Sequence, residues 1–235
     1  MIRTVMAAQG HTLLIIFAKE PTPGQVKTRL CPALSPEAAA RLYGQFLEDV
    51  IEEMTRVPQI DIVLAYTPAT ARPFFQERLT PDIHLVAQAG ADLGERLQQA
   101  FTWGFAQGAQ TVLIRNSDSP DLPGRLVTEA REMFARGQAR LVLGPSPDGG
   151  YYLVGLPSPQ PQLFHGITWS GPAVLAETLA RAERLGLAAH LLPPWPDIDT
   201  SEDLRAFLAT PKTSPSPGWR SYNLARTLIS GSNNP

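Results

Sequence analysis

The feature that most constrains the fold of this chain is a regular alternation of apolar, strand-like runs with segments of helical periodicity. Residues 13–17 are continuously apolar, which is typical of a parallel strand buried on both faces. Ser35 and Pro36 then form a helix-start signal, and apolar residues recur at helical spacing as far as Met54. Further strands are predicted at 60–66, 83–87, 140–144, 151–156 and 188–192 and from residue 111, and further helices at 70–79, 122–136, 172–185 and 219–229 and from residues 92 and 200. This alternation predicts an α/β fold, a three-layer α/β/α sandwich with a mostly parallel central sheet.

Length and composition favour one folded domain. A chain of 235 residues suits a single α/β domain, and a hydrophobic fraction of 43% is enough for a full core. We predict one domain over residues 1–210, followed by a Pro/Ser-rich linker and C-terminal tail over residues 211–235.

Charge and cysteine usage argue against several classes of function. A formal net charge of -2 lacks the basic excess that nucleic-acid-binding proteins carry. Cys31 is the only cysteine, so neither an intramolecular disulfide nor a thiolate metal cage can form. The first eleven residues lack a secretory signal pattern, and no apolar run approaches the roughly 18 residues of a membrane span. We expect a cytoplasmic protein with no nucleic-acid or membrane partner, and the oligomeric state is left open.

A polar turn follows the strand that starts at residue 111. Asp118 and Asp121 lie three positions apart on this turn, and Pro120 prevents regular strand pairing there. Ligands of α/β sheets bind at the carboxyl ends of the strands, so both acids are candidate ligands of a divalent metal ion that faces an anionic substrate. The alternative is that they cap the turn and the following helix, as aspartates often do.

A basic loop follows the first strand. It is shaped by prolines and Gly24 and carries Lys19, Lys27 and Arg29. Its position suits binding of a di- or triphosphate group, although the glycine patterns of P-loops and dinucleotide-binding folds are absent. Arg96, near the start of a later helix, is a further candidate nucleotide contact. The alternative is a solvated basic loop.

Two further segments are candidates for contact with an acceptor. Asp148 precedes Gly149 and Gly150, which either form an ordinary turn or admit a substrate close to the main chain. Tyr151 begins the strand after this turn and is included among the acceptor contacts. Trp169 is either buried core or a wall of the acceptor pocket.

The last acidic segment lies in a proline-rich loop after residue 192. Asp197 and Asp199 alternate about Ile198, so both side chains can point to one side while the isoleucine anchors the loop inward. Thr200 and Asp203 fit the start of a helix.

Together these segments resemble the GT-A, nucleotide-diphospho-sugar transferase superfamily. The matching motifs are Phe17-Ala18-Lys19 through Lys27-Thr28-Arg29-Leu30, residues 92–97, Ser117-Asp118 through Pro123, and residues 144–155 and 197–204. Over about residues 11–208 the chain more closely resembles a bacterial group of GT-A glycosyltransferases, also called radical-SAM/selenodomain-associated or arsenosugar-biosynthesis transferases. A more distant resemblance links it to guanylyltransferases of molybdenum-cofactor and phospholactate type.

The resemblance implies a Mg²⁺ or Mn²⁺ cofactor and a nucleotide sugar or nucleoside triphosphate as the partner, together with a small-molecule acceptor. The implied metal ligands are Asp118, Asp121 and Asp199. The implied phosphate and nucleotide contacts are Lys19, Gly24, Lys27, Arg29 and Arg96, and the implied acceptor contacts are Gly149, Gly150, Tyr151 and Trp169.

Three residues are the candidate catalytic groups. Asp118 would hold the metal ion, and Lys27 would stabilise negative charge that grows on the leaving diphosphate. Asp148 would orient or deprotonate an acceptor hydroxyl.

The residues leave open which bond is broken. The bacterial group favours glycosyl transfer, which we expect, whereas the Lys-x-x-x-x-Gly-x-x-Lys-Thr-Arg loop favours nucleotidyl transfer. A third alternative is a nucleotide-binding domain without catalysis. The feature that favours it is Asn116-Ser117, where the related group usually has a small Gly-Thr pair before the first aspartate.

Overall fold

The computed structural model describes residues 11–31 and 33–232. Within this range the strands form one seven-stranded sheet in the order β3-β2-β1-β4-β6-β5-β7. The strands are β1 (Thr12–Lys19), β2 (Ile60–Thr67), β3 (His84–Ala87), β4 (Thr111–Arg115), β5 (Leu141–Pro145), β6 (Tyr151–Leu156) and β7 (Ala189–Leu191). β6 runs antiparallel to both of its neighbours and the other four pairings are parallel, so the prediction of a mostly parallel sheet is confirmed.

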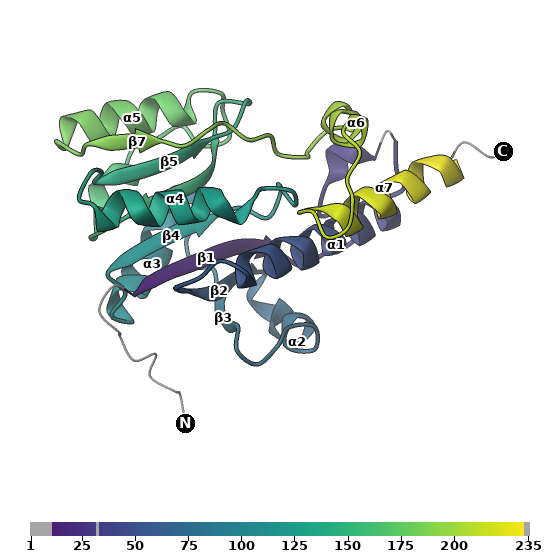
Figure 1. Cartoon of the computed structure of the whole chain (residues 1–235), viewed down its shortest axis with the longest axis horizontal. Coiled ribbons are helices and arrows are strands. Elements are labelled where there is room, and N and C mark those ends of the chain that lie inside the picture. Colours follow the sequence, from purple (N-terminus) through teal and green to yellow (C-terminus); the bar gives the residue numbers. More distant parts are fainter. Residues whose placement is uncertain (1–10, 32, 233–235) are drawn as a thin grey trace.

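Helices cover both faces of this sheet, which confirms the predicted α/β/α sandwich (Figure 1). One face carries α1, α4, α6 and α7, and the other carries α3 and α5. The helices are α1 (Pro36–Thr55), α2 (Arg72–Gln76), α3 (Leu93–Ala106), α4 (Gly124–Ala135), α5 (Val174–Arg184), α6 (Ser201–Ala209) and α7 (Trp219–Ser232), with short 3-10 turns η1 (Thr28–Leu30), η2 (Ala69–Ala71) and η3 (Pro161–Phe164). No helix in the described part of the chain combines the length and apolar character needed to cross a membrane.

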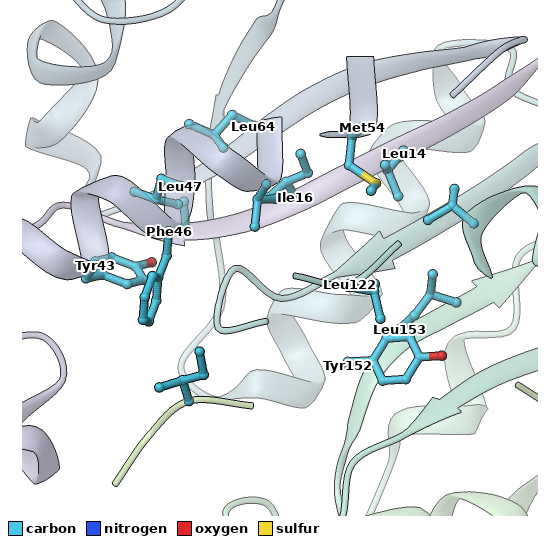
Figure 2. Close-up of a cluster of buried hydrophobic side chains, with 14 of the residues drawn as sticks. Leu14, Ile16, Tyr43, Phe46, Leu47, Met54, Leu64, Leu122, Tyr152 and Leu153 are labelled. Atoms are coloured by element: carbon cyan, nitrogen blue, oxygen red, sulfur yellow. The ribbon is translucent and has the colours of Figure 1, made fainter. Parts of the chain in front are cut away.

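The alternation of side chains along the strands divides the core into two layers. In β1, Leu14 and Ile16 belong to the cluster that packs under α1, whereas Leu13 and Ile15 belong to the cluster under α3 and α5. Figure 2 shows the first cluster, in which Met54 of α1 lies beside Leu14. A strand with two buried faces must be apolar throughout, which is why residues 13–17 carry no polar side chain.

The caps of the helices show where the sequence signals succeed and where they fail. Ser35 accepts a hydrogen bond from the Ala38 backbone N–H, and Thr200 forms a reciprocal capping box with Asp203, as predicted. The helix predicted from residue 122 begins at residue 124, because Pro123 is still extended and serves as the N-cap. Likewise, the helix predicted from residue 172 begins two residues later.

The C-terminal segment packs against the rest of the domain. α7 lies along α1 (Figure 1), and its Tyr222 and Ala225 are buried in the same core cluster as α1. Asp49 of α1 is 6% exposed and accepts hydrogen bonds from the backbone N–H and the hydroxyl of Ser221, at 2.8 and 2.7 Å. Through Tyr222 and Ala225, α7 therefore contributes to the same hydrophobic core as the sheet.

Candidate active site

A cleft of about 900 Å³ lies along the edge of the sheet where the parallel strands end. Because β6 is antiparallel, its first residue lies at the same edge as the last residues of β1, β4 and β5, so the loops that follow these strands converge. Most of the residues predicted from sequence line the cleft: Lys19, Lys27, Arg29, Arg96, Asp118, Asp148, Gly150, Tyr151, Trp169 and Asp199. Gly24, Asp121 and Gly149 are not among its lining residues.

Lys27 lies between two of the acidic residues in this cleft. Its Nζ is 2.5 Å from Asp118 Oδ1 and 2.7 Å from Asp199 Oδ1, and it donates to the Ile198 carbonyl at 2.7 Å. Burial by itself lowers the pKa of Lys27, but the two carboxylates more than offset burial, so its pKa is raised and the ammonium stays charged. The side chain is 4% exposed and joins the first loop to both acidic loops.

Two aromatic rings of α1 lie beneath this ammonium group. Lys27 Nζ is 5.8 Å from the ring centroid of Tyr43 and 5.6 Å from that of Phe46, within the range of cation–π attraction. Tyr43 Oη accepts from the Lys19 backbone N–H at 3.0 Å and shares a hydrogen bond with Ser117 Oγ at 2.8 Å. Burial raises the pKa of Tyr43 to about 12, so the phenol keeps its proton. The sequence carries no functional signal for Tyr43, because its position looks like an ordinary core position of an amphipathic helix.

Asp197 connects three of the loops around the cleft. Its Oδ1 accepts from Asn116 Nδ2 at 2.9 Å and from Ser119 Oγ at 2.5 Å, and its Oδ2 accepts from Ser146 Oγ at 3.2 Å. Burial, together with the charge of Asp118, raises the pKa of Asp197 to about 6. The Asn116 amide, which marks the departure from the related group, is therefore bound to this carboxylate. The alternation of acids about residue 198 was the sequence signal for this contact, but Asp197 was not among the predicted site residues.

A buried arginine supports the loop that carries Asp118. Arg115, at the end of β4, is 1% exposed, and its guanidinium donates to the carbonyls of Asn116 and Ser119 at 2.9 and 2.8 Å. Burial lowers the pKa of Arg115 to about 10, and nearby aspartates, Asp197 first among them, oppose this shift. The group is therefore charged at neutral pH. A lone charged residue at the end of an apolar strand is the signal that could have identified it.

Asp121 has a different environment from Asp118. Its Oδ1 accepts from Trp195 Nε1 at 2.9 Å, and its Oδ2 forms an ion pair with Lys212 at 2.9 Å. The side chain is 14% exposed. One oxygen thus holds the loop against Trp195, in the loop before α6, and the other holds it against Lys212, whereas Asp118 and Asp199 both contact Lys27 at the cleft.

The remaining predicted basic residues differ in their exposure and in whether they form hydrogen bonds or ion pairs. Lys19 and Arg29 are exposed at the cleft and form no ion pair with a described residue. Arg96 is half-buried and donates from Nε to the Gly90 carbonyl at 3.1 Å. Gly24 has φ 74 and shapes the basic turn from outside the cleft.

The turn between β5 and β6 carries an exposed carboxylate. Asp148 Oδ1 accepts from the Gly150 backbone N–H at 3.0 Å, which fixes the side chain beside the cleft. Gly149 has φ 90, and a Cβ there would lie 1.9 Å from the Pro172 carbonyl oxygen. The close approach that Gly149 permits is therefore to Pro172, just before α5, and not to the open cleft. The Leu175 N–H, in the first turn of α5, also donates to the Gly149 carbonyl.

Trp169 is both part of the core and a wall of the cleft, the two alternatives that the sequence left open. It packs against the buried cluster with Phe164, at a centroid distance of 6.5 Å, and it also lines the cleft. Gly94, at the start of α3, makes this possible, because a Cβ at that position would lie 2.5 Å from Trp169 Nε1.

The side chains of the cleft that could ligate a metal provide only part of the coordination that a hard divalent ion needs. In the described residues, no group of three or more His, Cys, Asp or Glu side chains is arranged to hold a metal ion. Asp118 and Asp199 present carboxylate oxygens on either side of Lys27. Mg²⁺ is commonly held by one or two carboxylates plus substrate phosphates, so two acids suffice if a nucleotide supplies the remaining oxygens.

Comparison with solved structures places the fold among nucleotide-using transferases. A provisionally assigned nucleotide-diphospho-sugar transferase from Desulfovibrio desulfuricans is 34% identical, with a TM-score of 0.86 over 94% of this chain and 97% of that chain. A CMP:2-keto-3-deoxy-manno-octonic acid synthetase complexed with CTP has a TM-score of 0.54 at 15% identity, over 85% of this chain and 98% of that chain. The 4-diphosphocytidyl-2C-methyl-D-erythritol synthase of Anaerococcus prevotii has a TM-score of 0.55 at 15% identity, over 86% and 97%. The last two show similarity of fold alone.

No curated protein matches the sequence. The sequence pattern of one family does match, over residues 50–171, which span the acidic loop and the turn between β5 and β6. The chain therefore belongs to the family described as "Uncharacterized protein conserved in bacteria (DUF2064)".

Proposed function

We propose that this protein is a metal-dependent transferase that moves a glycosyl group from a nucleoside-diphosphate sugar to a small acceptor. The observation that carries the proposal is the Lys27, Asp118 and Asp199 cluster inside a cleft large enough for a nucleotide. The resemblance to a nucleotide-diphospho-sugar transferase at 34% identity supports the same reading.

The basic residues of the first loop would hold the diphosphate of the donor. Lys19 and Arg29 are exposed at the cleft and available to phosphate oxygens. Lys27 would stabilise the negative charge that develops as the nucleoside diphosphate leaves.

Asp118 and Asp199 would hold a Mg²⁺ or Mn²⁺ ion together with the donor phosphates. When bound, such an ion neutralises phosphate charge and so makes the leaving group more stable. Since the single charge of Lys27 already offsets one of the two carboxylate charges, we expect ion binding to depend on the nucleotide. Asp148, which also lines the cleft, would orient or deprotonate the acceptor hydroxyl.

Nucleotidyl transfer is the second candidate. It is favoured by the position of Lys27, which comes from the Lys-Thr-Arg loop shared with guanylyltransferases and lies directly against Asp118. In that reaction the α-phosphorus of a nucleoside triphosphate is attacked and pyrophosphate is released.

A nucleotide panel tests the proposal. Thermal shift with nucleoside diphosphates, triphosphates and nucleotide sugars, with and without Mn²⁺, should identify a ligand that stabilises the protein, and turnover should follow with an acceptor. Asp118→Asn should abolish the Mn²⁺-dependent part of the shift, whereas Asp82→Asn, an exposed acid that does not line the cleft, should preserve it. Pyrophosphate release from a triphosphate would favour nucleotidyl transfer, and a shift without any product would indicate binding alone. No shift with any nucleotide would contradict the proposal.

A further inference from the structure

Gln88 lines the cleft directly after β3, and the backbone of two other strands fixes its side chain. Its own backbone N–H donates to the Tyr66 carbonyl at 2.8 Å, which continues the pairing of β3 with β2. Its Nε2 donates to the carbonyls of Ala65 and Ala18, at 2.7 and 3.3 Å, near the carboxyl ends of β2 and β1. The side-chain amide is therefore held in one orientation across the ends of three strands.

This anchoring decides which atom of the amide remains for a ligand. A glutamine amide has two N–H donors and one carbonyl acceptor. Both partners of Nε2 are carbonyl oxygens, so the nitrogen and the oxygen cannot exchange places without the loss of both hydrogen bonds. No described residue donates to Oε1, and Oε1 is not one of the buried polar atoms without a partner, so it is accessible to solvent. Gln88 thus offers the cleft a fixed acceptor and no free donor.

The strand ends around this amide are rich in hydrogen-bond acceptors. The carbonyls of Ala18 and Ala65 lie within hydrogen-bond distance of the same side chain, so three oxygens gather at one place with Oε1. A ligand that brings a further oxygen to this place leaves acceptors facing one another, whereas an N–H group can donate to Oε1. This part of the cleft therefore favours a ligand with an N–H donor.

The cleft also provides apolar surface near this acceptor. Phe17 is half-buried, lines the cleft and is paired with Ala65 in the register of β1 and β2, so it lies next to one of the anchoring carbonyls. Leu93, at the start of α3, also lines the cleft and is 42% exposed. Sites for small molecules combine apolar walls with a few fixed polar groups. A flat heterocycle with an N–H donor at its edge suits this combination.

Arg96 supplies a donor in the same segment of the chain. Its Nε donates to the carbonyl of Gly90, two residues after Gln88, and its Nη atoms donate to no described residue. A base that carries an amine also has ring or carbonyl acceptors, so a guanidinium at the cleft is compatible with the same ligand.

We propose that Gln88 recognises the base of the nucleotide and selects a base with an exocyclic amine, as in cytosine, adenine or guanine. The proposal rests on the proposed transfer function and names the class of nucleotide that it uses. In uracil and hypoxanthine a carbonyl oxygen replaces the amine of cytosine and adenine, and this oxygen would face Oε1 as a second acceptor. The ring N–H of these two bases adjoins a carbonyl oxygen, which the acceptor-rich strand ends disfavour.

Pairs of nucleoside diphosphates that differ at the amine test the proposal: CDP with UDP, ADP with IDP, and GDP with IDP. Calorimetric titration of the wild-type protein with Mn²⁺ present measures each affinity, and contacts to the identical phosphates cancel within a pair. The tightest binder should carry an amine and bind about tenfold more tightly than its amine-free twin, as expected when a fixed acceptor loses its donor. An amine-free diphosphate as the tightest binder, or equal affinities within its pair, would overturn the proposal.

A variant assigns the preference to Gln88. Gln88→Met removes the acceptor and keeps an unbranched side chain, and Gln99→Met makes the same change at an exposed position of α3 outside the cleft. Gln88→Met should bring the affinities within each pair close to equality, while Gln99→Met should preserve the preference. An unchanged preference in Gln88→Met, or an equal loss of affinity for all diphosphates, would contradict recognition of the base by this residue. Thermal unfolding without ligand shows whether each variant is folded, and the wild-type comparison does not depend on either variant.

The outcomes separate this proposal from the proposed function. A preference for amine-bearing bases without turnover with any acceptor would refute glycosyl transfer and retain the role of Gln88. Turnover that prefers a uridine donor over its cytidine counterpart, and an inosine donor over its adenosine and guanosine counterparts, would refute only the role of Gln88. Absence of binding by every nucleotide would refute both.

Discussion

At the scale of single residues, Lys27 organises the chemistry of the cleft. A buried ammonium group is tolerated only where counter-charges and hydrogen bonds compensate its lost hydration. Asp118, Asp199 and the Ile198 carbonyl provide that compensation, and the rings of α1 provide the apolar floor. The same lysine therefore links the nucleotide loop to both acids.

Replacing this lysine should separate its two effects. In Lys27→Met, turnover should fall by roughly 100-fold, by analogy with the loss of one preorganised donor to a developing negative charge. Binding of Mn²⁺ in the absence of nucleotide should become stronger, because Asp118 and Asp199 lose the cation that lies between them and offsets part of their charge. Calorimetric titration with Mn²⁺ and steady-state kinetics measure the two effects. Lys27→Arg keeps the charge and should show weak Mn²⁺ binding like the wild type; a matching gain in both variants would contradict this account.

At the scale of elements, single side chains hold together loops from distant parts of the chain through hydrogen bonds and close packing. Asp197 joins the loops after β4 and β5, and Trp169 docks on the first turn of α3 because residue 94 is glycine. Each of these contacts spans more than fifty residues of sequence.

The docking of Trp169 predicts the effect of a single methyl group. Gly94→Ala places a Cβ at 2.5 Å from Trp169 Nε1, so the indole must move. We expect a change in tryptophan fluorescence and a several-fold loss of acceptor affinity, with little change in nucleotide affinity. Trp169→Phe provides the control, since the smaller ring should accommodate the added methyl group when combined with Gly94→Ala. Unaltered fluorescence and acceptor binding in the single variant would refute the packing argument.

The buried Asp49 at the contact between α1 and α7 predicts that the free energy of unfolding depends on pH. Burial raises the pKa of Asp49 above its ordinary value of 3.8, although hydrogen bonds from Ser221 oppose the shift. As the pH rises past 3.8, the unfolded chain loses this proton before the folded protein does, so the contribution of Asp49 to the free energy of unfolding falls through its raised pKa. Urea denaturation between pH 3 and 7 should show that Asp49→Asn, relative to wild type, gains stability as the pH rises. Glu37→Gln, an exposed carboxylate on the same helix, is the control for loss of charge.

At the scale of the whole molecule, both faces of the sheet and the C-terminal segment form one packed body. Tyr222 of α7 is 7% exposed and packs edge-to-face on Phe207 of α6, with ring centroids 6.1 Å apart. α6 in turn follows directly after the loop that carries Asp197 and Asp199. The C-terminal helix thus supports the element behind the acidic loop.

Removing this ring should therefore destabilise the whole domain. Tyr222→Ala is expected to cost about 3 kcal/mol, the lower end of values for a buried aromatic side chain, and so to lower Tm by roughly 6–12 °C for a domain of this size. Differential scanning calorimetry should show one transition at a lower temperature. Tyr222→Phe keeps the ring and should differ little from wild type. A separate early transition would show instead that α7 unfolds independently.

The sequence by itself determined the layers of this protein and the segments that form its site. A layered α/β fold follows from apolar runs that alternate with amphipathic helices, and the carboxyl ends of parallel strands necessarily share one edge. Local signals also identified the basic loop, the acidic turn and the capping box at Thr200.

Only the tertiary structure decided which side chains meet. Asp118 and Asp121 carry the same chemistry three residues apart, yet one faces Lys27 and the other is bound by Trp195 and Lys212. Sequence periodicity describes neighbours along one element, whereas these partners come from segments 74 and more residues away, so their pairing depends on how the whole sheet brings its loops together. For the same reason Tyr43, a buried partner of the site, could be identified only with α1 packed against the acidic loop, because its partner Ser117 lies 74 residues away.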